Sequence, residues 1–247
     1  MIEVVNISKF FGDHEVLKNI SLEFEKGKTN LIIGRSGSGK TVLMKCLIGL
    51  YGVDKGHIDF DDRNFSKMTS KEQRNIRKEI GMLFQGGALF DSMNVEENVM
   101  FPLTMFSEKS YEEKLERVNF CLNRVALENS NKLFPSELSG GMTKRVAIAR
   151  AISMNPEYLF CDEPNSGLDP ITSGVIDELI SEITKEYQTT TIINTHDMNS
   201  VLKIGDKVAF IYDGELWWKG DKDQILETDN KELNNFVFAT ELTKRIK

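Results

Sequence analysis

Cysteine is scarce in this sequence, and its scarcity argues against two common ways of stabilising a small fold. The 247 residues contain three cysteines, Cys46, Cys121 and Cys161, which are odd in number and far apart. They fit neither a disulfide framework nor a zinc site, and such usage is typical of a reducing cytosol.

The chain also lacks a long apolar run and an excess of basic residues. No stretch of about 18 apolar residues occurs, so we expect no membrane-spanning helix. The first residues carry neither a basic segment nor a long apolar one, so we expect no secretory signal. The formal net charge is −7, whereas a nucleic-acid-binding domain usually carries an excess of Lys and Arg. We therefore expect no nucleic-acid partner.

The most informative segment that is present reads Gly34-Arg35-Ser36-Gly37-Ser38-Gly39-Lys40-Thr41. It follows an apolar run at 31–33, typical of a buried strand, and precedes a helical pattern at 42–48. This is the spacing of the phosphate-binding loop G-x-x-x-x-G-K-[ST]. The sequence therefore predicts a nucleotide-phosphate site here rather than an ordinary Gly/Ser turn.

Each part of this loop has a chemical reason. Its three glycines can adopt backbone angles that are closed to other residues, so successive N–H groups can point at phosphate oxygens. The following helix adds its positive dipole end at the same point. We expect Lys40 to reach the β- and γ-phosphates and the Thr41 hydroxyl to hold Mg²⁺.

Strand and helix signals alternate along the chain and predict an α/β fold with a mostly parallel sheet. Alternating segments near the N-terminus predict a small antiparallel sheet from 2–7, 10–17, 20–25 and 57–61. Buried strands are expected at 80–84, 158–161 and 190–194, and a hairpin with an Asp-Gly turn at 207–219. Helices are expected at 69–78, for about 15 residues up to Val125, at 139–153, at 170–186 and at 198–204.

These signals divide the chain into three parts. We interpret 86–155 as a helical subdomain inserted between strands of a core made of 1–85 and 156–228, and 229–247 as a C-terminal tail.

Two acids close one of these buried strands, in the segment Leu159-Phe160-Cys161-Asp162-Glu163. In a doubly wound fold the carboxyl edge of the sheet is where ligands bind. We expect Asp162 to hold Mg²⁺ and Glu163 to polarise the water that attacks the γ-phosphate.

A second anion-binding helix start is predicted at Leu138-Ser139-Gly140-Gly141-Met142. The Ser cap followed by two glycines leaves the first N–H groups of the helix bare. Within one folded monomer, we would not expect two such helix starts to face the same phosphate tail. In two copies placed head to tail, the phosphate loop of one copy and the Ser139 helix start of the other can face the same phosphates.

At this point the sequence resembles the nucleotide-binding subunits of ABC transporters over nearly its whole length. The phosphate loop, Gln85, the Ser139 motif, Asp162-Glu163-Pro164, Ser166-Gly167-Leu168-Asp169 and His196 occur in the order of that family. The resemblance implies a RecA-like P-loop NTPase core. It also implies two ATP molecules held between two subunits, each by the phosphate loop of one chain and by Ser139, Gly140 and Gly141 of the other.

The resemblance further implies individual roles. Gln85 would contact Mg²⁺ and water in a loop that senses the membrane partner. His196 would contact the γ-phosphate and position Glu163, and Asp169 would cross the dimer interface. Phe11 matches the aromatic residue that stacks on adenine, with Val16 beside it, although Phe10 is adjacent and remains an alternative. Met142 departs from the family, because most members have Gln at this position.

A narrower resemblance, to the ATPases of Mla/Mce-type lipid transporters, rests on three features: the segment 83–99, Met142, and the run 169–176. It implies transport of phospholipids or related lipids between the envelope membranes. The chain would then sit peripherally at the cytoplasmic face of the inner membrane and bind a permease. A small cytosolic regulatory subunit and a periplasm-facing lipid-binding subunit are further implied partners.

Several alternatives remain open at this stage. Residues Gly86 to Phe90 could form a docking groove for a permease helix, or Leu89 and Phe90 could fill the core. In the tail, Phe236, Ala239, Leu242 and Ile246 could form an apolar stripe that contacts a neighbouring subunit or packs on its own domain. The rival functions are an ABC ATPase for another cargo such as amino acids or lipoproteins, one of iron–sulfur assembly or regulatory type, and a P-loop kinase.

Overall fold

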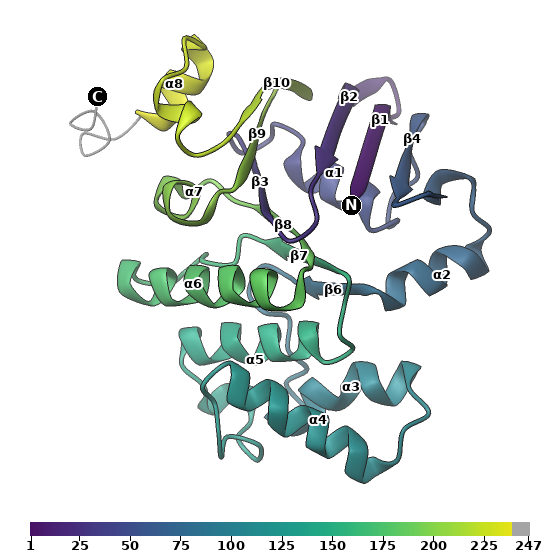
Figure 1. The fold of residues 1–247 in the computed structure, drawn as a ribbon, viewed down its shortest axis with the longest axis vertical. Helices are drawn as coiled ribbons and strands as arrows, with labels where there is room; N and C mark the ends of the chain where they lie inside the picture. Colours follow the sequence, from purple (N-terminus) through teal and green to yellow (C-terminus); the bar gives the residue numbers. More distant parts are fainter. Residues whose placement is uncertain (239–247) are drawn as a thin grey trace. The chain divides into compact units, whose positions relative to one another are not determined.

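The computed structural model describes residues 1–238 of the chain, drawn as a ribbon in Figure 1. These residues form two compact units. The first contains Met1–Gln73 and the chain from Thr190 onward, and the second contains Arg74–Thr189. None of the helices in residues 1–238 combines the length and apolarity needed to cross a membrane.

The first unit contains the antiparallel sheet expected near the N-terminus. Its strands, in the order β2-β1-β4-β5, are β2 (His14–Phe24), β1 (Ile2–Phe11), β4 (Lys55–Phe60) and β5 (Arg63–Asn64). Both β1 and β2 are longer than the sequence pattern predicted. The reason is that Asn6 and Asn19 adopt positive φ angles of 49° and 51° within the strands, and the β1–β2 register shifts on either side of Ile7. Such irregularities interrupt the alternation of buried and exposed residues without ending the strand.

The first unit also carries strands in the order β10-β9-β3-β8. They are β10 (Glu215–Gly220), β9 (Lys207–Tyr212), β3 (Thr29–Ile33) and β8 (Thr190–Asn194). Strand β3 is parallel to both β8 and β9, while β9 and β10 form an antiparallel hairpin. Every residue of β3 and β8 is buried, as expected for strands of a parallel sheet covered on both faces. The helices of this unit are α1 (Lys40–Leu47), α7 (Met198–Ile204) and α8 (Lys231–Val237).

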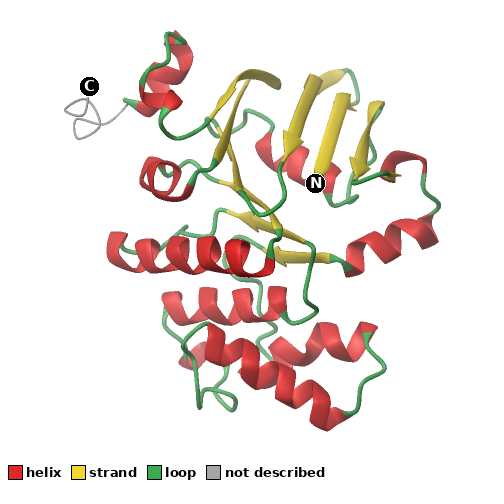
Figure 2. Cartoon of the chain, viewed as in Figure 1, coloured by secondary structure: helices red, strands yellow, loops and turns green. Residues whose placement is uncertain are grey.

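The second unit is mainly helical, as the red ribbons of Figure 2 show. Its parallel strands are β6 (Ile80–Leu83) and β7 (Tyr158–Asp162), and its helices are α3 (Val95–Phe106), α4 (Tyr111–Arg124), α5 (Gly140–Ile152) and α6 (Pro170–Tyr187). Helix α2 (Ser70–Lys78) carries the chain into this unit. Reciprocal capping boxes of Asn94 with Glu97 and of Ser110 with Glu113 begin α3 and α4.

Helix α5 is the centre of the second unit. It packs against α3, α4, α6 and β6. Its residues from Val146 to Ile152 are all buried, because partners surround the helix instead of covering one face of it.

The C-terminal tail is described as far as residue 238. Leu233 and Val237 of α8 are buried, and the Phe236 ring packs 5.6 Å from that of Phe210 on β9. The remaining members of the predicted apolar stripe, Ala239, Leu242 and Ile246, lie outside the described residues.

Candidate nucleotide site

The glycines of the loop that follows β3 occupy positions closed to other residues. Gly34, Gly37 and Gly39 have φ angles of 150°, 80° and 103°. A Cβ at Gly34 would lie 2.2 Å from the carbonyl oxygen of Ile211, and one at Gly39 would lie 3.0 Å from a methyl of Leu17. Because no side chain fits at either place, the backbone itself forms the wall of the loop.

The polar groups of this loop fit phosphate oxygens. The Lys40 Nζ donates to the carbonyls of Gly34 and Arg35 at 2.8 and 3.0 Å, which holds the ammonium group inside the loop. The buried Ser38 hydroxyl has no hydrogen-bond partner among the described residues. A buried hydroxyl of this kind normally has a partner, and a phosphate oxygen would supply one. Ser36 and Thr41 are exposed, and Thr41 lies in the first turn of α1.

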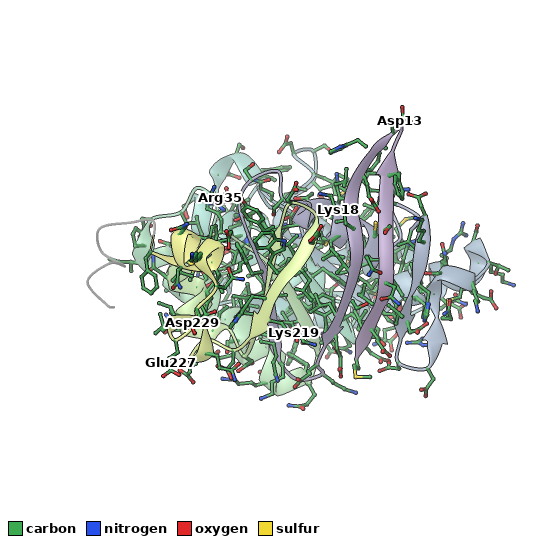
Figure 3. All side chains as sticks on the ribbon, turned by 90° about the horizontal axis from the view of Figure 1, so that it is seen from above. Asp13, Lys18, Arg35, Lys219, Glu227 and Asp229 are labelled. Atoms are coloured by element: carbon green, nitrogen blue, oxygen red, sulfur yellow. The ribbon has the colours of Figure 1, made fainter. Side chains whose placement is uncertain are left out.

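The β9–β10 hairpin braces the phosphate loop. Its Asp-Gly turn brings the Gly214 N–H to the Ser38 carbonyl at 3.1 Å, and the Gly214 carbonyl accepts from the Lys18 N–H at 2.8 Å. Lys18, labelled on β2 in Figure 3, also forms an ion pair with Asp213 at 3.0 Å. The sequence indicated the turn but not this contact, because no local pattern links the hairpin to the loop.

The aromatic residues expected near adenine lie at the end of β1. The Phe11 ring is 44% exposed and stands edge-on, 5.3 Å from the Tyr51 ring. Phe10 is half-buried, with the Lys55 ammonium 5.4 Å from its ring. Val16 is placed beside the loop, because a Cβ on Gly39 would lie 3.1 Å from its carbonyl. Tyr51 was not singled out in the sequence, since no spacing pattern links it to β1.

His196 leaves the sheet at the same edge as the phosphate loop. Strands β3 and β8 are parallel with Ile32 opposite Asn194, and the Thr195 N–H donates to the Ile32 carbonyl at 3.1 Å. His196 follows directly in the exposed segment before α7.

The second unit places Gln85 and the two acids at a common sheet edge. Strands β6 and β7 are parallel with Leu83 opposite Cys161, so Gln85, two residues after β6, and Asp162, the last residue of β7, both lie at the carboxyl ends of these strands. Glu163 adopts a left-handed φ of 48°, and its carbonyl accepts from the Ser166 N–H at 3.1 Å. Within residues 1–238, no group of three or more His, Cys, Asp or Glu could hold a metal ion. The expected Mg²⁺ set of Thr41, Gln85 and Asp162 contains only one such residue.

Two helix starts lie side by side in the second unit. Ser139 caps α5 by accepting from the Met142 N–H at 3.3 Å, and Asp169 caps α6 by accepting from the Ile171 and Thr172 N–H groups, both at 3.0 Å. A Cβ on Gly141 would lie 2.8 Å from the Thr172 methyl. Hydrogen bonding to Thr172 lowers the pKa of Asp169.

Two buried cations of α5, which the sequence analysis did not single out, hold the neighbouring loops. The Lys144 Nζ donates to the Glu163 carbonyl at 3.5 Å, and the Arg150 guanidinium donates to the carbonyls of Gly87 and Ala88 at 2.7 and 2.8 Å. Burial lowers the pKa of both Lys144 and Arg150. The sequence signal for Arg150 was a charge between apolar residues of a helical stretch, whereas Lys144, between Thr143 and Arg145, had no such signal.

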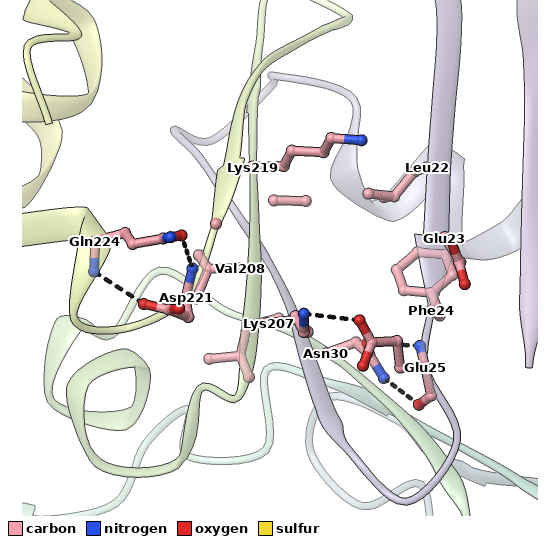
Figure 4. Close-up of a pocket in the computed structure, with 13 residues that line it drawn as sticks. Leu22, Glu23, Phe24, Glu25, Asn30, Lys207, Val208, Lys219, Asp221 and Gln224 are labelled. Atoms are coloured by element: carbon pink, nitrogen blue, oxygen red, sulfur yellow. Dashed lines mark hydrogen bonds and ion pairs between the residues drawn. The ribbon is translucent and has the colours of Figure 1, made fainter.

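Each unit also has a cavity. In the first unit, a cavity of about 320 Å³ lies at the ends of the strands opposite the phosphate loop (Figure 4). Lys207 and Glu25 form an ion pair of 2.7 Å there, so its polar lining is already partly paired. In the second unit, a cavity of about 490 Å³ is lined by Gly86, Ala88, Leu89, Asp91, Pro135, Ser136 and Thr143.

Comparison with known proteins matches this chain to ATP-binding proteins of the ABC transporter family. The profile of the ABC transporter family matches residues 17–166. The methionine import ATP-binding protein MetN of Clostridium tetani is 40% identical over 98% of this chain and 76% of its own length. The intermembrane phospholipid transport ATP-binding protein MlaF of Haemophilus influenzae is 37% identical over 96% and 90%. The dimeric bacterial ABC transporter cassette MJ0796 superposes with a TM-score of 0.82 at 31% identity, over 90% of this chain and 99% of its own, and is also known in a post-hydrolysis state with ADP and Pi.

Proposed function

This chain belongs to the ABC transporter family as an ATP-binding subunit that hydrolyses ATP with Mg²⁺, and we propose that the transporter it drives moves a phospholipid or a related envelope lipid. The observation that carries the lipid assignment is the segment 83–99, which resembles Mla/Mce-type ATPases, together with Met142 at the start of α5. The similarity to MlaF over 90% of that protein supports it. The similarity to MetN favours methionine import as the second candidate.

We propose that two copies close head to tail around two ATP molecules. The phosphate loop of one copy, with Lys40 and its backbone N–H groups, would bind the phosphates, and Ser139, Gly140 and Gly141 of the other copy would complete the site. This arrangement accounts for two anion-binding helix starts in one chain. The dimeric state of the MJ0796 cassette supports it. Asp169 would lie at the interface, beside the Ser139 cap that it neighbours within the second unit.

Within each site the side chains of this protein would have separate roles. Thr41, Gln85 and Asp162 would hold Mg²⁺, which when bound neutralises phosphate charge. Glu163 would orient and polarise the attacking water, and His196 would contact the γ-phosphate. Phe11, the more exposed of the two adjacent rings, would stack on adenine beside Val16.

The permease would seat in the 490 Å³ cavity of the second unit. Its lining is mostly small, with Gly86, Ala88, Leu89 and Pro135 beside the polar Asp91, Ser136 and Thr143, and would suit a short partner helix. Phe90 is 41% exposed rather than buried in the core. Docking there would hold the chain at the cytoplasmic face of the inner membrane. A small regulatory subunit, and a periplasm-facing lipid-binding subunit joined through the permease, would complete the assembly.

The test is to purify the chain from detergent-solubilised membranes and identify the co-purifying subunits and lipids. We expect a multi-span permease, a lipid-binding subunit and bound phospholipid. A matched Leu89→Glu variant should lose the permease while still binding ATP, because it changes only the docking cavity. A periplasmic amino-acid-binding protein in place of the lipid-binding subunit would establish the methionine alternative, and the absence of any permease would contradict a transport role.

A further inference from the structure

The charged side chain of Lys144 is buried inside the second unit. Its side chain, on the second turn of α5, is 3% exposed. Lysine is almost never buried to this degree without a partner, because removing an ammonium group from water is costly. Methionine would fill the same volume without that cost, so packing alone does not explain the residue.

The Lys144 ammonium faces the turn that follows β7. Its Nζ donates to the Glu163 carbonyl at 3.5 Å, and the same carbonyl accepts from the Ser166 N–H at 3.1 Å. The charges of Asp162 and Glu163 also act on Lys144. The Glu163 carbonyl therefore accepts hydrogen bonds from two donors, the Lys144 ammonium and the Ser166 N–H.

These two hydrogen bonds are made to a residue whose backbone is strained. Glu163 has a φ of 48°, in the left-handed region that residues other than glycine, asparagine and aspartate rarely occupy. Such a conformation persists only when its surroundings determine it. The backbone angles of Glu163 set the direction of its Cα–Cβ bond, and so limit the region that the carboxylate can reach.

We propose that Lys144 is a positioning residue for ATP hydrolysis, whose ammonium holds the turn after β7 and thereby aims the Glu163 carboxylate at the attacking water. The inference rests on the proposed role of Glu163. Lys144 itself touches neither nucleotide nor water in this scheme and acts through the main chain of Glu163.

The test compares Lys144→Met with Lys144→Arg in the full-length protein, purified with its permease where the two co-purify. Lys144→Met keeps the aliphatic stem and removes the donor, and we expect kcat for ATP to fall by about 10- to 100-fold, the usual effect of a small misplacement of a reacting group. The KM for ATP should change less than about threefold, because the phosphate loop is untouched. Lys144→Arg should restore most of the lost turnover, and thermal unfolding should confirm that both variants fold.

A second pair of variants separates this inference from the function it rests on. In a Glu163→Gln background, adding Lys144→Met should cause no further loss, because the carboxylate that Lys144 positions is already gone. Unchanged kcat in folded Lys144→Met, a rise in KM alone, or failure of Lys144→Arg to restore turnover would overturn the inference. If Lys144→Met does not fold, Lys144→Leu, which also lacks a donor, carries the same test with the same expected loss. Normal turnover by Glu163→Gln would overturn both the role of Glu163 and that of Lys144.

Discussion

The side-chain amide of Asn165 donates a 2.7 Å hydrogen bond to the carboxylate of Asp177. Both residues are buried, at 8% and 2% exposed. Asn165 lies in the loop between β7 and α6, and Asp177 lies on α6 itself. This bond therefore fastens the loop that runs from Glu163 to the Asp169 cap onto the helix that follows it.

Asn165→Ala should destabilise the protein by about 1–3 kcal/mol, because it deprives a buried carboxylate of a donor. Urea unfolding would measure the loss. An exposed residue of the same helix provides the control, and Lys185→Ala should change stability by less than about 0.5 kcal/mol. Equal effects from the two substitutions would show that the Asn165–Asp177 bond contributes nothing to stability.

Lys40→Ala and Glu163→Gln should separate binding from hydrolysis. Lys40→Ala removes a charged donor to phosphate, worth about 1.5–3 kcal/mol, so ATP affinity should fall by about 10- to 100-fold. Glu163→Gln should keep ATP binding and lose turnover. A titration with fluorescent ATP and a phosphate-release assay measure the two quantities, with the exposed Lys71→Ala as the control. Loss of ATP binding in Glu163→Gln would contradict the role given to this carboxylate.

Gly214→Ala should destabilise the brace of the phosphate loop. The added Cβ would lie 2.4 Å from the Val16 carbonyl, at a φ of 79°, so the turn, β2 or the loop must shift. We expect a loss of about 1–3 kcal/mol in unfolding free energy together with weaker ATP binding. Gly52→Ala is the matched control, because nothing lies within 4 Å of its added Cβ. If the two variants bind ATP equally well, the hairpin does not shape the site.

Glu96 should contribute to a loss of stability in acid. Burial alone would raise the pKa of Glu96, but hydrogen bonds from Asn131, Lys132 and Tyr111 outweigh it and hold the pKa below the ordinary 4.5. A carboxyl whose pKa is lower in the folded state stabilises the fold above the unfolded pKa, and this contribution is lost as the pH falls through the folded value.

The measurement is unfolding free energy against pH, from neutral pH down to about pH 3, for the natural protein and for Glu96→Gln. The variant should show a shallower decline below pH 4.5. Glu116→Gln, an exposed residue on α4, should leave the decline as it is. A natural protein and Glu96→Gln with parallel curves would show that Glu96 does not set the acid response.

Local sequence patterns correctly predicted helices and strands whose formation depends on interactions between neighbours in the sequence. The helix predicted at 198–204 and the strand at 190–194 agree with α7 and β8, because capping and alternation depend on neighbours in sequence. The strand limits near Asn6 and Asn19 were wrong, since left-handed residues inside a strand break the alternation that the prediction relied on.

The supporting contacts of the site could not be predicted in this way. The Lys144 bond to Glu163 and the Gly214 bond to Ser38 join distant parts of the chain. Motif residues were recognisable because phosphate chemistry dictates their type and spacing. The residues that hold them in place are dictated only by the finished packing, which composition and periodicity do not encode.

The contact of Gly214 with Ser38 also has a consequence during protein synthesis. A growing chain emerges N-terminus first, so the phosphate loop leaves the ribosome long before the hairpin that braces it. A nascent fragment that ends ahead of β9 carries the whole glycine motif and still lacks Gly214, whose N–H donates to the Ser38 carbonyl. We therefore expect such a fragment to bind nucleotide less tightly than the finished polypeptide does.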